Sequence, residues 1–166
     1  PEYHGGIVQA VHSTFSNCVT GVRLEPYQRR DGQASAQLDN RSRFQGCDFL
    51  TTATWPDAAS QAPDVHLFMN GVHGIKVTDC AFRNQAPGLF QPNAIGRGIF
   101  AFGSGFKVQG DDEPTSSAFE NLYLGIVSYP GPFETYTVDR MHFLNNMWGI
   151  YDLASTATQV SRNTFL

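Results

Sequence analysis

Residues 143–150 read Phe-Leu-Asn-Asn-Met-Trp-Gly-Ile, and the frame of this stretch recurs along the chain. The frame is a Phe, an Asn two residues later, a Gly four residues after the Asn, and then an aliphatic residue. A chain that repeats in this way builds its core by stacking equivalent residues, so the frame predicts a solenoid. The other full copies begin at Phe15, Phe82 and Phe119, and two further phenylalanines, Phe49 and Phe165, continue the series.

The residues that precede each Phe have the composition of short β-strands. Val77–Phe82 and Val138–Phe143 contain β-branched, small and aromatic residues and end near Asn or Gly. No window of ten or more residues has apolar spacing at the helical period, so we expect almost no helix. The shortest step, from Phe143 to Phe165, is 22 residues. A unit of this length suits a coil of three short strands separated by bends.

Such coils would place each Phe over the Phe of the next coil. Burial of each ring contributes about 1.5–3 kcal/mol, and stacking between rings adds to this. We expect the Asn to lie in a left-handed bend, and the Gly to supply the backbone freedom for the turn into the next strand. The copy at Phe49 has Thr51 and Trp55 instead of Asn and Gly, so its bend should differ as far as Asp64.

Two stretches of the chain, Gly74–Asn84 and Asn145–Ile150, resemble the repeats of right-handed parallel β-helices, the pectate-lyase-like superfamily. The tract from Val65 to Phe102 is similar to repeat regions of large secreted or surface proteins of the Bacteroidetes type IX secretion class. The resemblance implies an all-β fold, a right-handed parallel β-helix solenoid of about six coils with loop insertions. It implies a fold rather than an activity, because solenoid repeats hold the coil together.

Composition limits the classes of function. The 166 residues suffice for one domain. The net charge of -4 argues against a nucleic-acid partner, which would need a basic stripe, and no apolar run reaches the length of a membrane span. Leu166 falls inside a repeat and Pro1 is not an initiator Met. We therefore expect residues 1–166 to be a single β-helix segment of a longer chain, or a trimmed piece of one.

The cysteines follow the repeat. Cys47 and Cys80 each precede their Phe by two residues, so stacked coils would place them one above the other. Two alternatives stay open for this pair, namely two small buried thiols or a disulfide. With Cys18 the count is odd, which does not suit a disulfide framework, and no spacing suggests a zinc site.

Candidate functional residues lie in the loops, because the scaffold residues are common to every coil. Sugar rings stack on aromatic faces, so the loop aromatics Tyr27, Trp55, Tyr129 and Phe133 are candidate carbohydrate-binding residues; alternatively, their rings cover the coil edges. Asp111, Asp112 and Glu113 form the densest acidic cluster. They are candidate calcium ligands, or else a solvated turn.

No convergent catalytic set is recognisable, so no catalytic residue is assigned. The leading hypothesis is a non-catalytic extracellular or cell-surface segment, which serves as a stalk, adhesin or glycan-binding region. Its partners would be the rest of a parent chain and polysaccharide or neighbouring surface proteins. The alternative is a polysaccharide-active enzyme, a lyase or glycoside hydrolase, of the pectate-lyase-like superfamily. A third hypothesis is end-to-end assembly with other copies.

Overall fold

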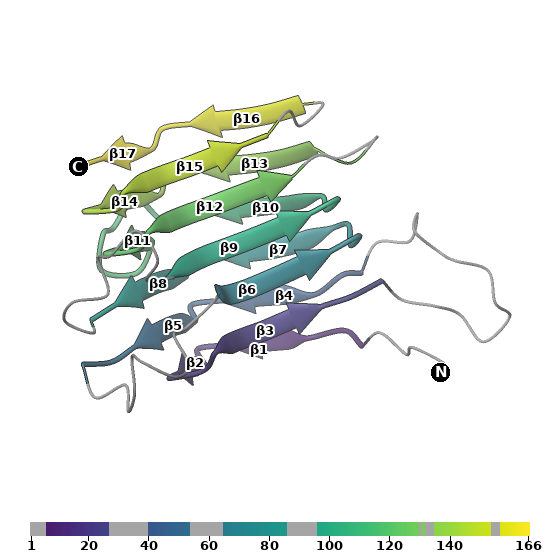
Figure 1. Cartoon of the computed structure of the whole chain (residues 1–166), viewed down its shortest axis with the longest axis horizontal. Helices are drawn as coiled ribbons and strands as arrows, with labels where there is room; N and C mark the ends of the chain where they lie inside the picture. Colours follow the sequence, from purple (N-terminus) through teal and green to yellow (C-terminus); the bar gives the residue numbers. More distant parts are fainter. Residues whose placement is uncertain are drawn as a thin grey trace, which may run out of the picture.

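A computed structural model of the chain describes residues 6–26, 40–53, 65–85, 96–129, 131, 135–153 and 157–166. Within these ranges all regular structure is β, and no helix occurs. The strands form three sheets in which every neighbouring pair is parallel (Figure 1). The predicted all-β class is therefore confirmed for the described part of the chain. These residues include no helix long and apolar enough to cross a membrane.

Among the described residues, sheets A and B take one strand from each of six coils, and sheet C takes one from each of the first five. Sheet A consists of β1 (Gln9–Val11), β4 (Arg43–Gln45), β7 (Ile75–Thr78), β10 (Phe106–Gln109), β13 (Thr135–Asp139) and β16 (Ala157–Ser161). Sheet B consists of β2 (Thr14–Ser16), β5 (Asp48–Thr51), β8 (Ala81–Asn84), β11 (Ala118–Glu120), β14 (His142–Leu144) and β17 (Thr164–Phe165). Sheet C consists of β3 (Thr20–Leu24), β6 (Val65–Asn70), β9 (Arg97–Phe102), β12 (Leu124–Tyr129) and β15 (Trp148–Asp152). The chain visits the sheets in the order A, B, C, an arrangement consistent with a parallel β-helix or a similar solenoid.

The six phenylalanines of the repeat form a continuous ladder on the inner side of sheet B. Adjacent rings have centroids 4.6 to 5.0 Å apart and are nearly parallel. Phe49, Phe82 and Phe119 are completely buried. The predicted ladder is confirmed. It fixes the register of sheet B, because a shift by one residue would turn every ring to the outer face.

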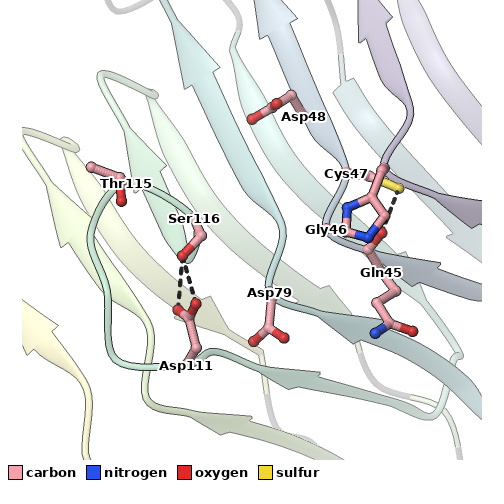
Figure 2. A pocket seen from close by; sticks show the side chains of 9 residues that line it. Gln45, Gly46, Cys47, Asp48, Asp79, Asp111, Thr115 and Ser116 are labelled. Atoms are coloured by element: carbon pink, nitrogen blue, oxygen red, sulfur yellow. Dashed lines mark hydrogen bonds between the residues drawn. The ribbon is translucent and has the colours of Figure 1, made fainter.

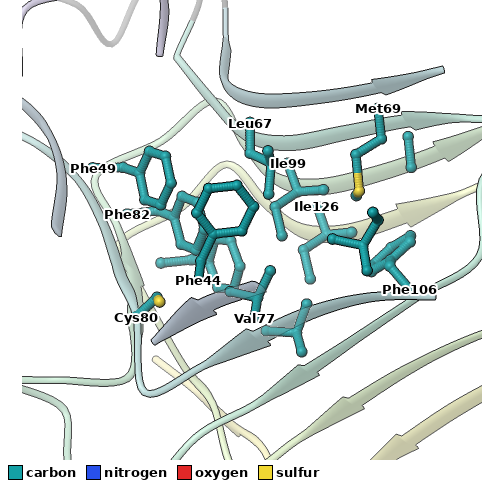
Figure 3. Packing of buried hydrophobic residues seen from close by; sticks show 14 of the residues in the cluster. Phe44, Phe49, Leu67, Met69, Val77, Cys80, Phe82, Ile99, Phe106 and Ile126 are labelled. Atoms are coloured by element: carbon teal, nitrogen blue, oxygen red, sulfur yellow. The ribbon is translucent and has the colours of Figure 1, made fainter. Parts of the chain in front are cut away.

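The other two sheets complete the core with their own columns of apolar side chains (Figure 3). In sheet A, Phe44, Val77, Val108 and Val138 are buried. In sheet C, Leu67, Ile99 and Ile126 are in register and have no exposed surface. The ring of Phe44 packs edge-on against Phe49, with centroids 5.8 Å apart, so the columns of sheets A and B interlock.

Three of the four asparagines of the full copies lie in left-handed bends, as the sequence predicts, whereas the fourth, Asn84, ends strand β8 and has no positive φ. Asn17, Asn121 and Asn145 have φ of 53°, 55° and 52°. These left-handed conformations follow sheet B and turn the chain toward sheet C. Asn is among the few non-Gly residues that tolerate them, because its short polar side chain bonds locally. The bend between sheets A and B uses the same conformation without a fixed residue type, at His12, Gly46, Asp79, Arg140 and Arg162.

The turn predicted at the repeat glycines is wrong for the three copies that the structure describes; Gly88 lies outside the described residues. Gly21, Gly125 and Gly149 lie inside β3, β12 and β15, and none of them has a positive φ. Gly98 holds the equivalent position in β9. A Cβ on Gly98 would lie 2.5 Å from the backbone oxygen of Gly125 and 2.6 Å from the ring of Phe119. The glycine is therefore required by close packing under the Phe ladder and not by a turn.

The two stacked cysteines are buried free thiols, as the first alternative predicted. The backbone N–H of Cys47 lies 3.4 Å from the sulfur of Cys80. Burial raises the pKa of the Cys80 thiol to about 12. Both side chains belong to the apolar core, which keeps them unreactive.

Candidate functional site

The outer side of sheet C carries a row of aromatic side chains. We call Phe68, Phe100, Phe102, Tyr129, Trp148 and Tyr151 the aromatic face. Phe68 and Phe100 stack with centroids 5.5 Å apart, and Phe100 and Tyr129 follow at 5.2 Å. Phe102 is 51% exposed, Trp148 48% and Tyr151 37%. The row therefore crosses the strands from β6 to β15 and presents ring surface to solvent.

Strand register produces this row. Phe68, Phe100, Val127 and Tyr151 occupy the same position in four successive strands of sheet C. This position follows the inward-facing aliphatic residue of each copy, so its side chain points outward. Parallel strands lie about 4.8 Å apart, which brings neighbouring rings of the column to stacking distance.

A pocket of about 260 Å³ opens in the aromatic face. Its walls come from Phe100 on β9, Tyr129 on β12, and Trp148 and Tyr151 on β15. The rings of Trp148 and Tyr151 meet edge to face, with centroids 5.8 Å apart. Val127, which is 1% exposed, lies among these rings, so the pocket has an apolar floor.

Arginine side chains lie against the aromatic face. The guanidinium of Arg97 lies 5.2 Å from the centre of Phe100, and that of Arg23 lies 4.5 Å from the centre of Phe68. Cations over ring faces are held by the ring quadrupole. Arg97 also lines the pocket. The pocket thus combines apolar ring faces with a fixed hydrogen-bond donor, which is the chemistry that a polar ligand with an apolar side requires.

The structure locates one of the four predicted carbohydrate-binding aromatics. Tyr129 lies at the end of β12 and lines the pocket. Tyr27, Trp55 and Phe133 lie outside the described residues. Sequence reasoning missed Phe100, Trp148 and Tyr151 because it searched the loops, whereas these rings stand on strands. Phe100 and Tyr151 had a signal in the sequence, because each directly follows a Gly-aliphatic pair, whereas Trp148 precedes its Gly and had none.

The predicted calcium ligands lie in an insertion between β10 and β11. The carboxylate of Asp111 accepts hydrogen bonds from the backbone N–H of Glu113 and from the hydroxyls of Ser116 and Ser117. Asp112 instead lies near His142, with 3.8 Å between the imidazole Nε2 and a carboxylate oxygen. Among the described residues no group of three or more His, Cys, Asp or Glu side chains is arranged to hold a metal ion. A calcium site at Asp111, Asp112 and Glu113 stays a prediction.

The same insertion forms one wall of a cavity of about 340 Å³ at the bend between sheets A and B (Figure 2). Three carboxylates from successive coils line it, those of Asp48, Asp79 and Asp111, together with the imidazole of His12. In Figure 2, Asp79 lies between Asp111 and Gln45. The stacking of coils and the insertion thus bring together acidic residues that are distant in sequence.

The pKa values of two of these carboxyl groups shift in opposite directions. Burial raises the pKa of Asp79, and the negative charge of Asp111 raises it further, although Arg140 opposes the shift. Burial by itself would raise the pKa of Asp111 also. The hydrogen bonds from Ser117 and Ser116 outweigh it and hold that pKa below the usual value. Neighbouring carboxyls with opposite shifts are an arrangement that can supply a proton donor beside a charged carboxylate.

Comparison of the chain with protein-family models, with curated proteins and with solved structures found no match.

Proposed function

We propose that this chain is a non-catalytic, carbohydrate-binding segment of a right-handed parallel β-helix within a larger extracellular or cell-surface protein. The aromatic face and its pocket are the observation that carries this proposal. The resemblance of the repeat to the pectate-lyase-like superfamily supports the right-handed coil, and the three parallel sheets that the chain visits in turn support a solenoid. The low content of charged residues, 16%, and the same resemblance support the location outside the cell.

A sugar ring has both apolar and polar surface. A pyranose has C–H groups on its faces and hydroxyls at its edge, so it can stack on an aromatic ring while its edge makes hydrogen bonds. Phe100, Tyr151 and Trp148 supply ring surface, and Arg97 supplies donors beside it. Rigid aromatic side chains lose little conformational entropy on binding.

The direction of the aromatic face indicates a polymer. Its rings follow the axis along which coils stack, and successive rungs are about 4.8 Å apart. An extended polysaccharide could contact several rungs at once. Many contacts of modest strength then add up to a useful affinity, as in other multivalent binding.

Affinity electrophoresis tests the proposal. Gels would contain xylan, laminarin or polygalacturonate, and migration of the chain would be compared with that in a plain gel. We expect at least one polysaccharide to retard the chain, and Trp148→Ala and Tyr151→Ala each to weaken binding roughly tenfold. Val11→Ala, which shortens an exposed apolar side chain on sheet A, is the control. Retardation that is equal in all four proteins would contradict a binding role for the aromatic face.

A second candidate function is glycoside hydrolysis at the cavity in Figure 2. The opposite pKa shifts of Asp79 and Asp111 favour it, because such hydrolases pair a protonated carboxyl with a charged one. In this reading Asp79 donates the proton to the leaving oxygen as the glycosidic bond breaks, and a water molecule attacks the sugar carbon. Asp111, held by hydrogen bonds from three donor groups, stabilises the positive charge that develops on the sugar.

Release of reducing ends from the same three polysaccharides tests this second candidate. Hydrolysis by the chain should be lost in Asp79→Asn and kept in Asp112→Asn, whose carboxylate does not line the cavity. Absence of reducing ends, or equal release by both variants, would exclude the cavity as a hydrolytic site.

A further inference from the structure

The outer side of sheet A carries a column of positive charge. Arg43, Lys76 and Lys107 occupy register-paired positions on β4, β7 and β10. All three side chains point to solvent, and Lys76 and Lys107 are the only lysines in the chain. We call these three residues the basic column. A chain with a net charge of -4 and two lysines has thus placed both of them on adjacent rungs of one sheet.

The basic column is unfavourable for the fold. Like charges directly opposite one another on neighbouring strands destabilise a sheet, and the strands here are about 4.8 Å apart. No ion pair joins Arg43, Lys76 or Lys107 to a carboxylate among the residues that the structure describes. The repulsion is therefore not relieved within the described fold, and a bound anion would relieve it.

A pocket of about 350 Å³ lies beside the two lysines. Its lining also includes His73 and the hydroxyl-bearing side chains of Thr135 and Thr137, and it contains no carboxylate. Gly105 keeps the pocket open next to His73, because a Cβ there would lie 3.1 Å from the imidazole Nδ1. Two ammonium groups, an imidazole and two hydroxyls match a ligand that carries negative charges as well as hydroxyls.

Unlike the aromatic face, the outer side of sheet A has no aromatic side chain at its described strand positions, and this difference limits the class of ligand. Its described strand positions hold Gln9, Val11, Arg43, Gln45, Lys76, Thr78, Lys107, Gln109, Thr135, Thr137, Asp139, Ala157, Gln159 and Ser161. No aromatic ring is among them, so bases of a single-stranded nucleic acid would find nothing to stack on. Asp139 points to the same side but is bonded to Arg162 and Ser161.

From the basic column and its pocket we infer a second binding site, which takes the negatively charged groups of an acidic polysaccharide. The site is separate from the aromatic face and does not depend on the function proposed for that face. The carboxylate or sulfate groups of the polymer lie along Arg43, Lys76 and Lys107. Its hydroxyls bond Thr135, Thr137 and His73. The column runs along the axis of coil stacking, so successive charges of the polymer meet successive rungs.

Three polymers with one backbone test the site and separate the two kinds of charge. They are dextran, carboxymethyl dextran and dextran sulfate, each added to the whole chain in affinity electrophoresis at low and moderate salt. We expect retardation by carboxymethyl dextran, by dextran sulfate or by both, and none by dextran. Retardation should weaken as salt rises, because binding releases counterions. Which charged polymer binds more tightly identifies the carboxylate or the sulfate ester as the preferred group.

Variants of the column make the test specific. Lys76→Gln and Lys107→Gln should each weaken binding of the charged polymer roughly tenfold, because each removes a hydrogen bond to a charged group. Lys76→Arg and Lys107→Arg should keep it. Arg23→Gln removes the same charge from sheet C and should bind as the unaltered chain does. Thermal unfolding should show that neither Gln variant is less stable, since each relieves repulsion.

Three results would overturn the inference. The first is that neither charged polymer retards the chain, and the second is that the lysine variants bind as tightly as the unaltered chain. The third is that Arg23→Gln weakens binding as much as the lysine variants do. The last result would show attraction by overall charge rather than by a site.

Discussion

A methyl group on Gly125 would lie 2.5 Å from the backbone oxygen of Gly149 and 3.1 Å from the ring of Phe143. The neighbouring coil and the Phe ladder thus leave no space for a side chain at this position. Gly21 and Gly98 are equally close to the backbone oxygen of the next coil. The repeat therefore keeps glycine so that sheet C can approach the rings of sheet B.

Gly125→Ala should lower the free energy of unfolding by about 1–3 kcal/mol. Overpacking of the folded chain costs more free energy than the substitution gains by reducing the conformational entropy of the unfolded chain. Urea unfolding of both proteins measures the difference. Gly6→Ala is the matched control, since nothing lies within 4 Å of its added Cβ, and it should change the stability by less than about 0.5 kcal/mol. Equal stability of Gly125→Ala and the unaltered chain would show that the coils can move apart.

A second residue-scale feature is the buried imidazole of His66. It occupies the register position of the repeat glycines, between Gly21 and Gly98. Its Nε2 lies 3.2 Å from the hydroxyl of Thr51, and its Nδ1 has no hydrogen-bond partner. Burial lowers the pKa of His66 to about 4. The folded chain therefore holds this side chain neutral.

The stability of the fold should depend on this histidine below neutral pH. The unfolded chain takes up the proton near pH 6.5 and the folded chain only near pH 4. Protonation of His66 therefore does not affect the free energy of unfolding above pH 6.5, and it lowers that free energy as the pH falls from 6.5 toward 4. The loss amounts to as much as about 3 kcal/mol. Urea unfolding at pH 7 and pH 4.5 measures it. His66→Gln should show a smaller difference between the two pH values, and an identical difference in both proteins would contradict the assignment.

At the scale of elements, Arg83 on β8 attaches the insertion between β10 and β11 to the body of the coil. Its guanidinium donates to Glu120 at 3.1 Å, to Asp48 at 3.2 Å and to the backbone oxygens of Pro114 and Thr115. The insertion forms a wall of the cavity that contains Asp79 and Asp111. One side chain thus links three coils and shapes that cavity.

Arg83→Met should release the insertion without unfolding the coil. Hydrogen exchange of residues 113–117 should become faster. The free energy of unfolding should fall by about 1 kcal/mol, since the partners are partly exposed. Mass spectrometry measures hydrogen exchange in the insertion and in the strands of the coil. Arg23→Met breaks an exposed pair with Glu25 on another sheet and should leave exchange in 113–117 unchanged. Unchanged exchange in Arg83→Met would show that the hydrogen bonds within the insertion suffice.

The element scale also shows what the sequence could predict. The Phe ladder and the left-handed asparagines follow from fixed offsets, because equal positions in stacked coils have equal surroundings. The basic column could not be found by offset from the Phe, since the insertion before Phe119 moves Lys107 to a different distance. Its signal was the likeness of Ile75-Lys76-Val77 and Phe106-Lys107-Val108. The glycine role was missed because the contact that requires it comes from the next coil.

At the scale of the whole molecule, the outward side chains form three regions of different chemistry. Sheet C carries the aromatic face and sheet A the basic column, while the cavity with Asp79 and Asp111 lies at the bend between sheets A and B. A solenoid allows this division, because each coil repeats the same inward residues and leaves the outward residues free to differ. We therefore expect function in such a chain to reside in columns of outward residues that run across the strands.

Nuclear magnetic resonance of the isotopically labelled chain tests the central claim, that the aromatic face binds carbohydrate, most directly. Hexasaccharides of xylan, laminarin and polygalacturonate would be titrated in turn. We predict that the backbone amides of Arg97–Phe102, Leu124–Tyr129 and Trp148–Asp152 shift on binding, and that Tyr151→Ala needs about ten times more sugar to reach the same shifts. Shifts confined to sheet A or to the residues around Asp79 and Asp111, or no shift with any of the three sugars, would contradict the claim.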